Sequence, residues 1–235
     1  MTSYIDWNCH LLSGMREGIS TQQESIEALS VLHNHGIEQV CFMPDFSPSV
    51  EPISHFLLRR DLAFERLKPH LPTGMKARLT ARVQMEPGLH LVEGLDRLCF
   101  TKQGYLALRM PIAEYADWID FEINRLLYRA HFKRLLFTSF DTCVLMYPTE
   151  ILEKLMRIPH AVFQFHYQSL TDADARAVMV KLLRNNQTVL LGSEITTLGK
   201  TYFFDLPYYI EAAHKAMSVA DIQTILRQNL YFWRK

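Results

Sequence analysis

The sequence lacks a long apolar run. No stretch of its 235 residues approaches the roughly 18 consecutive apolar residues that a membrane helix needs. The opening, MTSYIDWNCH, has no positively charged region followed by an apolar segment, as a secretory signal would. We therefore expect a cytoplasmic protein without a membrane span.

An excess of charge of either sign is also missing. The 25 Lys+Arg residues balance the 25 Asp+Glu residues, so the formal net charge is zero. The bulk attraction that drives non-specific nucleic-acid binding is then absent, and no nucleic-acid partner is expected. The 49% content of hydrophobic residues is enough for a sizeable core and excludes a disordered chain.

Cysteine pairs and the common catalytic signatures are absent as well. The four cysteines lie far apart with no CxxC pair, which argues against a zinc knuckle or a disulfide scaffold. The chain contains no GxGxxG, Walker, GxSxG or HExxH motif. Ten histidines are nevertheless present, and they raise the question of a metal site.

Short apolar runs alternate with segments of helical periodicity along the whole chain. The predicted strands are 3–7, 38–42, 77–85, 105–110, 134–139, 161–167 and 188–192. The predicted helices are one between Thr21 and Gly36, then 50–67, 118–132, 149–157, 171–185, 208–217 and 218–230. No Gly/Ser-rich or Pro-rich linker interrupts this order, so we predict one domain over 1–235.

Seven consecutive βα units predict an α/β fold with a parallel sheet. That number favours a closed or nearly closed barrel over an open doubly wound sheet, which usually has five or six strands. In a barrel of this kind the residues at the carboxyl ends of the strands form the site. The strand ends are therefore the positions to inspect.

The first strand end carries Tyr4-Ile5-Asp6-Trp7-Asn8-Cys9-His10, followed by Leu11-Leu12-Ser13-Gly14-Met15-Arg16-Glu17-Gly18 and, after a helix, by Met43-Pro44-Asp45. These segments resemble a degraded copy of the opening of the PHP (polymerase and histidinol phosphatase) superfamily. They are most similar to the manganese-dependent bacterial tyrosine phosphatases of capsule and exopolysaccharide synthesis. Residues 104–111, 135–142 and 191–196 resemble later motifs of that family in the same order. The resemblance implies a distorted (β/α)7 TIM-like barrel of the PHP type.

Carried over residue by residue, the resemblance implies that most metal-binding imidazoles are lost. His10 is the only family histidine that remains. At four positions where the family has histidine, this sequence has Asn8, Asp45, Ser139 and Thr196. Glu17 and Glu194 keep an acidic residue, and Glu86 lies near a family glutamate. Asp141 lies in the motif whose family arginine is Thr142 here. The set His10, Glu17, Asp45 and Glu194 would hold at most one divalent ion, Mn or Mg, because its donors are mainly oxygens.

Arg109 offers a different way to neutralise these acids. It stands where the family has an acidic residue on its fourth strand, and alternation places it on one face with Tyr105 and Ala107. If that face points inward, its guanidinium would lie among Glu17, Asp45 and Glu194 and replace a metal ion. A fixed cation and a single retained metal ion are the two alternatives.

Three other features stay open at this level. His166 shares a strand face with Gln164, and it either lines the site or is an ordinary core histidine. The aromatic cluster 202–209 either stacks a sugar or a tyrosine or packs a loop on the barrel rim. The apolar, basic tail 231–235 is expected to dock on its own barrel rather than on a partner.

Two main functional hypotheses follow. In the first, the chain is a pseudoenzyme, a catalytically impaired or non-catalytic binding or regulatory protein that recognises a phosphotyrosine-bearing protein or a polysaccharide-synthesis component. In the second, it is a phosphoesterase with one metal ion and a metal-activated water. A metal-free enzyme with Asp45 or Glu194 as general base, its pKa raised by neighbouring acids, is a third alternative.

Overall fold

The strands of the protein run parallel and form two sheets. The computed structural model describes residues 4–100, 104–128 and 134–234. One sheet has the order β1-β2-β4 and the other β3-β5-β6-β7-β8-β9. The strands are β1 (Tyr4–Cys9), β2 (Ile37–Phe42), β3 (Asp45–Phe46), β4 (Lys76–Leu79), β5 (Arg82–Gln84), β6 (Tyr105–Arg109), β7 (Arg134–Thr138), β8 (Val162–His166) and β9 (Thr188–Gly192). The predicted α/β class with parallel strands is confirmed.

Two connections of two residues each link the sheets. Met43–Pro44 connects β2 to β3, and Thr80–Ala81 connects β4 to β5, so the predicted strand 77–85 is divided between the two sheets, while β3 lies beyond the predicted strand 38–42. The backbone N–H of Arg82 donates to the carbonyl of Pro44 at 3.0 Å, which carries the pairing across the break. The break is where Asp45 and Arg82 become neighbours, because these residues pair at the start of β3 and β5.

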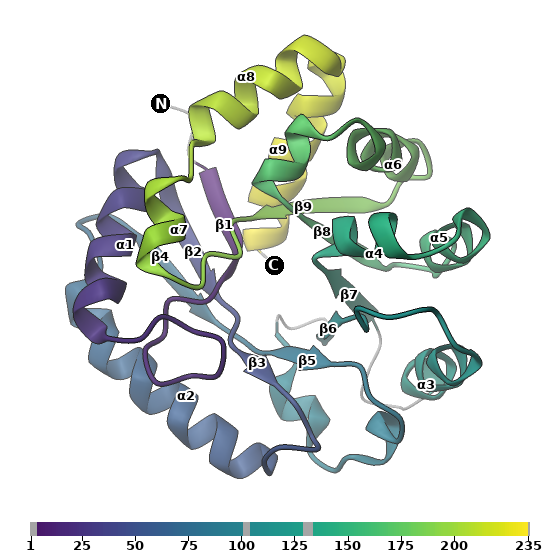
Figure 1. Ribbon diagram of the computed structural model, residues 1–235, viewed down its shortest axis with the longest axis horizontal. Coiled ribbons are helices and arrows are strands. Elements are labelled where there is room, and N and C mark those ends of the chain that lie inside the picture. The colour runs from purple at the N-terminus through teal and green to yellow at the C-terminus, as the bar shows by residue number, and fades with distance from the viewer. Residues whose placement is uncertain (1–3, 101–103, 129–133, 235) are drawn as a thin grey trace.

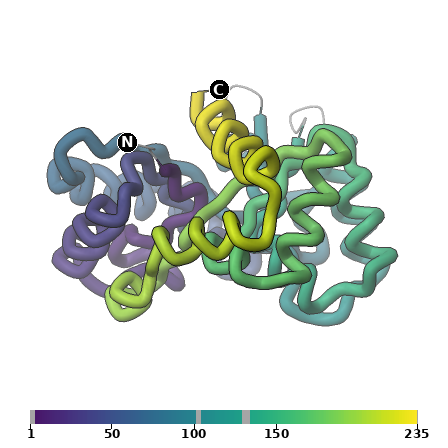
Figure 2. The backbone as a smooth tube through the Cα atoms, turned by 90° about the horizontal axis from the view of Figure 1, so that it is seen from above, coloured from purple at the N-terminus to yellow at the C-terminus, as the bar shows by residue number. Residues whose placement is uncertain are grey.

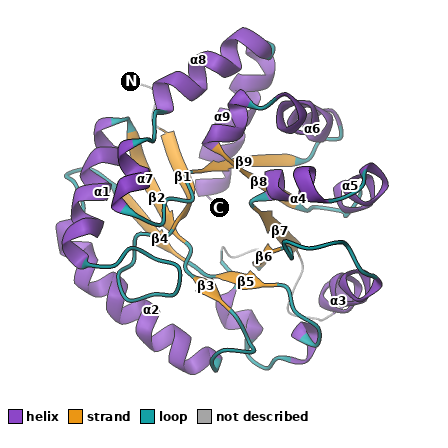
Figure 3. Cartoon of the chain, viewed as in Figure 1, coloured by secondary structure: helices purple, strands orange, loops and turns teal. Residues whose placement is uncertain are grey.

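Helices surround the strands (Figure 3). They are α1 (Gln22–Asn34), α2 (Ile53–Leu67), α3 (Asp117–Tyr128), α4 (Phe140–Met146), α5 (Thr149–Met156), α6 (Ala173–Arg184), α7 (Leu198–Tyr202), α8 (Leu206–Ala216) and α9 (Val219–Arg234). Within the described residues, none is long and apolar enough to cross a bilayer.

The predicted helices are present with shifted ends, and two short helices were missed. The predicted capping box is confirmed, because the Thr21 hydroxyl accepts from the backbone N–H of Glu24, whose side chain accepts from the N–H of Thr21. The predicted start at residue 50 is wrong, since α2 begins after Pro52. The helices α4 and α7 span only seven and five residues, too few to show a helical period. Positions 129–132 of the predicted third helix lie outside the described residues.

The C-terminal tail packs on the first strand. Trp7 is fully buried, and its ring lies 5.2 Å from that of Phe232 and 5.4 Å from that of Trp233 between centroids. Phe232 and Trp233 lie at the C-terminal end of α9, the yellow helix at the top of Figure 2. The predicted docking of the tail on its own chain is confirmed for these two residues.

The first and last strands lie side by side, with β1 next to β9 in Figure 1. Just beyond the strands, the N–H of Glu194 donates to the Asn8 carbonyl at 2.7 Å and that of His10 donates to the Ile195 carbonyl at 3.2 Å. Gly192 permits this approach, because a Cβ atom there would lie 2.7 Å from the backbone nitrogen of Asn8 and 2.8 Å from its Cβ. The contact sets Glu194 at the mouth of the strands.

This close approach predicts that Gly192→Ala destabilises the fold. The added methyl group forces β1 and β9 apart, and overpacking of this kind costs about 1–3 kcal/mol of unfolding free energy. Gly199→Ala in α7 is the matched control, since the atom nearest its Cβ is 4.0 Å away and alanine favours a helix. Urea unfolding checks the pair, and equal midpoints for both variants would contradict the prediction.

Candidate functional site

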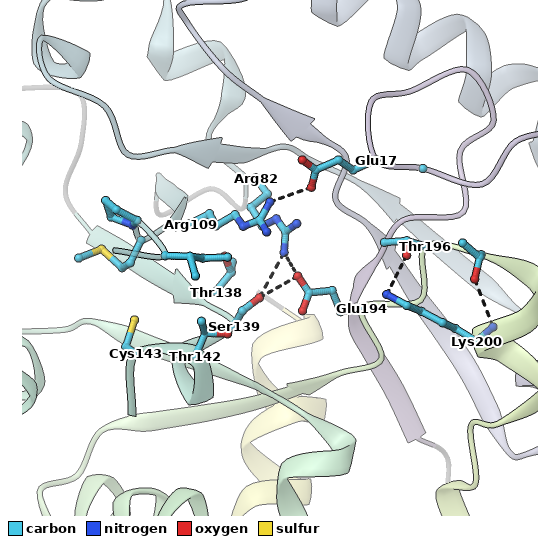
Figure 4. Close-up of a pocket in the computed structure, with 15 residues that line it drawn as sticks. Glu17, Arg82, Arg109, Thr138, Ser139, Thr142, Cys143, Glu194, Thr196 and Lys200 are labelled. Carbon is cyan, nitrogen blue, oxygen red and sulfur yellow. Dashed lines mark hydrogen bonds and ion pairs between the residues drawn. The ribbon is translucent and has the colours of Figure 1, made fainter. Parts of the chain in front are cut away.

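A pocket of about 520 Å³ opens at the carboxyl ends of the strands (Figure 4). The charged and hydroxyl side chains that line it include Glu17, Arg82, Arg109, Ser139, Thr142, Glu194, Thr196 and Lys200. Asp45 lies behind this wall, bound to both arginines. The structure therefore brings Glu17, Asp45 and Glu194 to one place through two guanidinium groups.

Arg82 lies at the centre of this cluster and is only 1% exposed. Its Nε and Nη2 donate to the two carboxylate oxygens of Asp45, the second at 2.8 Å, and its Nη1 donates to Glu194 Oε1. The same Nη1 donates to Ser139 Oγ at 3.2 Å. Burial alone lowers the pKa of a guanidinium, but the hydrogen bonds and charges of Asp45 and Glu194 outweigh it and raise the pKa. Arg82 is thus a permanent buried cation.

Arg109 is a second, more exposed cation beside the first. Its Nη1 donates to Glu17 Oε2 at 2.8 Å and to Asp45 Oδ2 at 3.3 Å. The prediction that its guanidinium lies among Glu17, Asp45 and Glu194 is met for the first two only, because Arg82 takes Glu194. Sequence reasoning missed Arg82. The available signal was an arginine between the apolar residues Ala81 and Val83, in the part of the run 77–85 that forms a buried strand.

His10 is buried next to this cluster and neutral. Its Nε2 lies 2.9 Å from Asn8 Oδ1, and the Asn8 amide donates in turn to Gln164 Oε1 at 2.9 Å. Its Nδ1 has no hydrogen-bond partner within the described part of the chain. Burial, helped by the charge of Arg82, holds the pKa of His10 well below its ordinary range. His10 therefore contacts Asn8 through its Nε2 rather than any of the three acids.

His166 joins the cluster from β8, where both of its ring nitrogens face acids. Its Nδ1 lies 2.5 Å from Asp141 Oδ2, and its Nε2 forms an ion pair with Glu194 Oε2. Burial acts to lower the pKa of His166, but Asp141 and Glu194 outweigh it and raise the pKa. Glu194 responds in the opposite direction: burial acts to raise its pKa, and His166 and Arg82 together lower it to about 2. Of the two interpretations of His166, the structure favours a residue that lines the site, because it forms part of a pocket wall and contacts Glu194.

Three site residues adopt a left-handed backbone conformation that is rare outside glycine. The φ angles are 55° at Glu17, 50° at Ser139 and 49° at Glu194. Such conformations cost on the order of 1–3 kcal/mol and gather at functional sites. Here each one turns the chain at the pocket, and each side chain is held by Arg82 or Arg109.

Other predicted site residues lie further out. The Glu86 carboxylate accepts from Ser47 Oγ and, at 3.2 Å, from the N–H of Ser49, so the structure does not bring it into the cluster. Thr196 lines the pocket and accepts from Lys200 Nζ at 3.1 Å. Asp141 contributes only through His166 and accepts from Ser169 Oγ at 2.7 Å.

Comparison with known proteins finds the fold but no family. No protein-family model and no curated protein matches the sequence. The fold is similar to that in crystal structures of YwqE from Bacillus subtilis and CpsB from Streptococcus pneumoniae, described as unique metal-dependent tyrosine phosphatases. That match has a TM-score of 0.70 and 15% identity, over 96% of this chain and 95% of the other.

Two further structures share the architecture at lower similarity. A phosphotriesterase homology protein from Escherichia coli, with phosphate in its active site, matches at a TM-score of 0.53 and 13% identity over 97% of each chain. An amidohydrolase from Burkholderia ambifaria with bound zinc matches at 0.50 and 11% identity, over 96% of this chain and 84% of the other. The fold is therefore one that metal-dependent hydrolases use.

The side chains present do not fit a metal ion. Within the described residues, no three His, Cys, Asp or Glu side chains are placed to hold one. The physical reason is that the oxygens of Asp45 and Glu194 already face Arg82, and a second cation at the same oxygens would meet a fixed positive charge. The prediction of a single-metal set formed by His10, Glu17, Asp45 and Glu194 has no support in this geometry.

The clamped His166 predicts a stability that depends on pH. Because the folded chain raises its pKa above the ordinary 6.5, the stability it contributes is complete below that pH and is lost as pH rises through the folded value. Replacing it by glutamine should therefore lower the free energy of unfolding more at pH 6 than at pH 9. Glu194, with a pKa of about 2, stays ionised throughout this range.

Urea unfolding of wild type and His166→Gln at both pH values measures this difference. The neutral His10 is present in both chains, so its own pH dependence cancels. A stability loss that is the same at pH 6 and pH 9 would mean that His166 carries no charge in the folded state.

Proposed function

We propose that this chain is a distorted (β/α)7 barrel of the PHP type that has exchanged its metal site for internal ion pairs and acts as a non-catalytic binding protein. The pairing that continues across the two sheets and the hydrogen bonds between the ends of β1 and β9 support a closed ring of seven strand positions. The similarity in fold to metal-dependent tyrosine phosphatases supports this ancestry.

The observation that carries the proposal is the buried guanidinium of Arg82. It binds both oxygens of Asp45 and one of Glu194, and so it neutralises the two acids that the resemblance assigns to a metal. A bidentate arginine–carboxylate pair fixes geometry as a metal ion does, but it cannot activate a water molecule. The cluster is thus organised without a group that generates a nucleophile.

Glu194, His10 and His166 are each poorly suited to act as a general base. A base working near neutral pH needs a pKa close to 7. Glu194, with a pKa lowered to about 2, is far too weak, and His10 is buried with its pKa depressed and its Nε2 on Asn8. His166 contacts an acid at each ring nitrogen, and these acids raise its pKa, which favours the protonated form over a base. The alternative of a metal-free enzyme with a carboxylate of raised pKa therefore finds no support at Glu194.

The ligand that we propose is a phosphotyrosine-bearing segment of another protein, in polysaccharide synthesis. The similar tyrosine phosphatases motivate the phosphotyrosine, and the open pocket of about 520 Å³ is large enough for such a side chain. Binding without turnover would let the protein cover or retain its partner in the phosphorylated state.

Removal of Arg82 provides a direct test of the cation exchange. Arg82→Met removes the buried cation that Asp45 and Glu194 share, which should cost about 3–5 kcal/mol of unfolding free energy. Millimolar Mn²⁺ should restore part of that stability in the variant and leave wild type unchanged, as read by thermal unfolding. Arg109→Met is the matched control, because its guanidinium is more exposed and Arg82 remains in place.

A second measurement covers the case in which Arg82→Met does not fold. Wild type titrated with Mn²⁺ in a calorimeter should show no stoichiometric binding. Tight binding of one ion by wild type, together with an upward shift in its melting temperature, would overturn the assignment of Arg82 as the resident cation.

Assays of hydrolysis test the absence of catalysis. Wild type with Mn²⁺ or Mg²⁺ should release phosphate from p-nitrophenyl phosphate and from a phosphotyrosine peptide no faster than a protein-free blank. Robust hydrolysis that depends on the metal and is abolished by His10→Ala would refute the non-catalytic proposal and favour the phosphoesterase.

A further inference from the structure

The main pocket continues into a smaller one. The second pocket has a volume of about 280 Å³ and shares Glu194 and Lys200 with the first. Its other walls include Phe203, Phe204 and Tyr209. A ligand that fills both pockets must pass beside Lys200.

Lys200 differs from the other basic side chains of the site because its ammonium group is not paired with an acid among the described residues. Arg82, Arg109 and His166 each form ion pairs with acids of the cluster. Within the described part of the chain, the Lys200 ammonium forms no ion pair and donates only to the hydroxyl of Thr196, at 3.1 Å. An ammonium group has three donors, so at least two remain for a ligand. Lys200 is therefore the cation of this cluster that is available to bind an anion.

Phe203 differs from Phe204 and Tyr209 in its exposure to solvent. Phe204 and Tyr209 are buried, and their rings lie 5.7 Å apart between centroids. Phe203 is 86% exposed although it forms part of the wall of the second pocket. The aromatic cluster thus divides into a packed part, as the rim interpretation predicted, and the exposed rings of Tyr202, Phe203 and Tyr208, of which Phe203 lines the second pocket next to Lys200.

We infer that Lys200 and Phe203 together form a recognition site for an anion that carries a flat ring. The anionic group lies at the Lys200 ammonium where the two pockets meet, and the ring lies in the second pocket against Phe203. A charge-assisted hydrogen bond holds the first part, and offset or edge-to-face ring contact holds the second. This inference rests on the proposed function, because it names the residues that select the ligand of a pocket proposed to bind without turnover.

Phenyl phosphate, inorganic phosphate and glucose 1-phosphate are the probes for this site. Calorimetric titration of wild type should give tighter binding of phenyl phosphate than of inorganic phosphate. Phe203→Ala should weaken phenyl phosphate by about three- to tenfold and leave inorganic phosphate unchanged. Lys200→Met should weaken both by about tenfold or more. Tighter binding of glucose 1-phosphate than of phenyl phosphate would overturn the assignment of a flat aromatic ring.

Two matched variants control for changes remote from the site. Tyr128→Ala removes an aromatic ring that is 87% exposed on α3, and Lys76→Met removes an exposed charge on β4. Both should bind all three probes as wild type does. Equal effects of Phe203→Ala and Tyr128→Ala on phenyl phosphate, or undiminished binding by Lys200→Met, would overturn the inference, as would the absence of phenyl phosphate binding by wild type.

These outcomes are distinct from failure of the proposed function. Turnover of phenyl phosphate in the presence of Mn²⁺ would refute the non-catalytic proposal while leaving the effects of Lys200 and Phe203 on affinity measurable. A different result would refute only the recognition site. If wild type does not bind Mn²⁺, and if Lys200→Met and Phe203→Ala bind the probes as wild type does, the ion-pair assignment stands and the recognition site is refuted.

Discussion

A buried guanidinium must be neutralised, and the side chains at the carboxyl ends of these strands are arranged to do it. Moving such a cation out of water costs several kcal/mol unless hydrogen-bonded anions accompany it. Arg82 meets this condition with Asp45 from the neighbouring strand and Glu194 from the segment after β9. Because these three residues come from different parts of the chain, the requirement of one side chain fixes how the segments meet.

The same requirement spreads across the site as a chain of alternating charges. From one side to the other it runs Glu17, Arg109, Asp45, Arg82, Glu194, His166 and Asp141. Every acid in this row of alternating charges contacts a basic side chain, so the carboxylates that line the pocket do not repel an anion as free acids would. Residues in such a network do not act independently, and changes at neighbouring positions are expected to be non-additive.

Much of this arrangement could be predicted from the sequence, and the part that was missed has physical reasons. Strand positions and parallel order follow from apolar runs and helical spacing, and the meeting of Glu17, Asp45 and Glu194 was anticipated from the resemblance. The principal cation, Arg82, was not predicted. The direction of a side chain near the break at Thr80–Ala81 is poorly specified by a period of two, since the strand pairing is interrupted there.

Short helices and ionisation states lie beyond what local patterns specify. The helix α4 has seven residues and α7 has five, so neither completes two full turns of pattern. The charge of His166 depends on Asp141 and Glu194, which are brought to it by tertiary structure alone. Local sequence around His166 carries no trace of either partner.

The hydrogen bonds between the ends of β1 and β9 have a consequence for the order of folding. Asp6 accepts from the N–H of Ser193 at 2.8 Å, across 187 residues of chain. A contact of such length forms slowly, because the intervening loop must first lose its entropy. Because Glu194 directly follows Ser193, the contact that joins the first and last strands also sets the second acid beside the buried cation. Closing this end of the fold and completing the charge network therefore depend on the same segment.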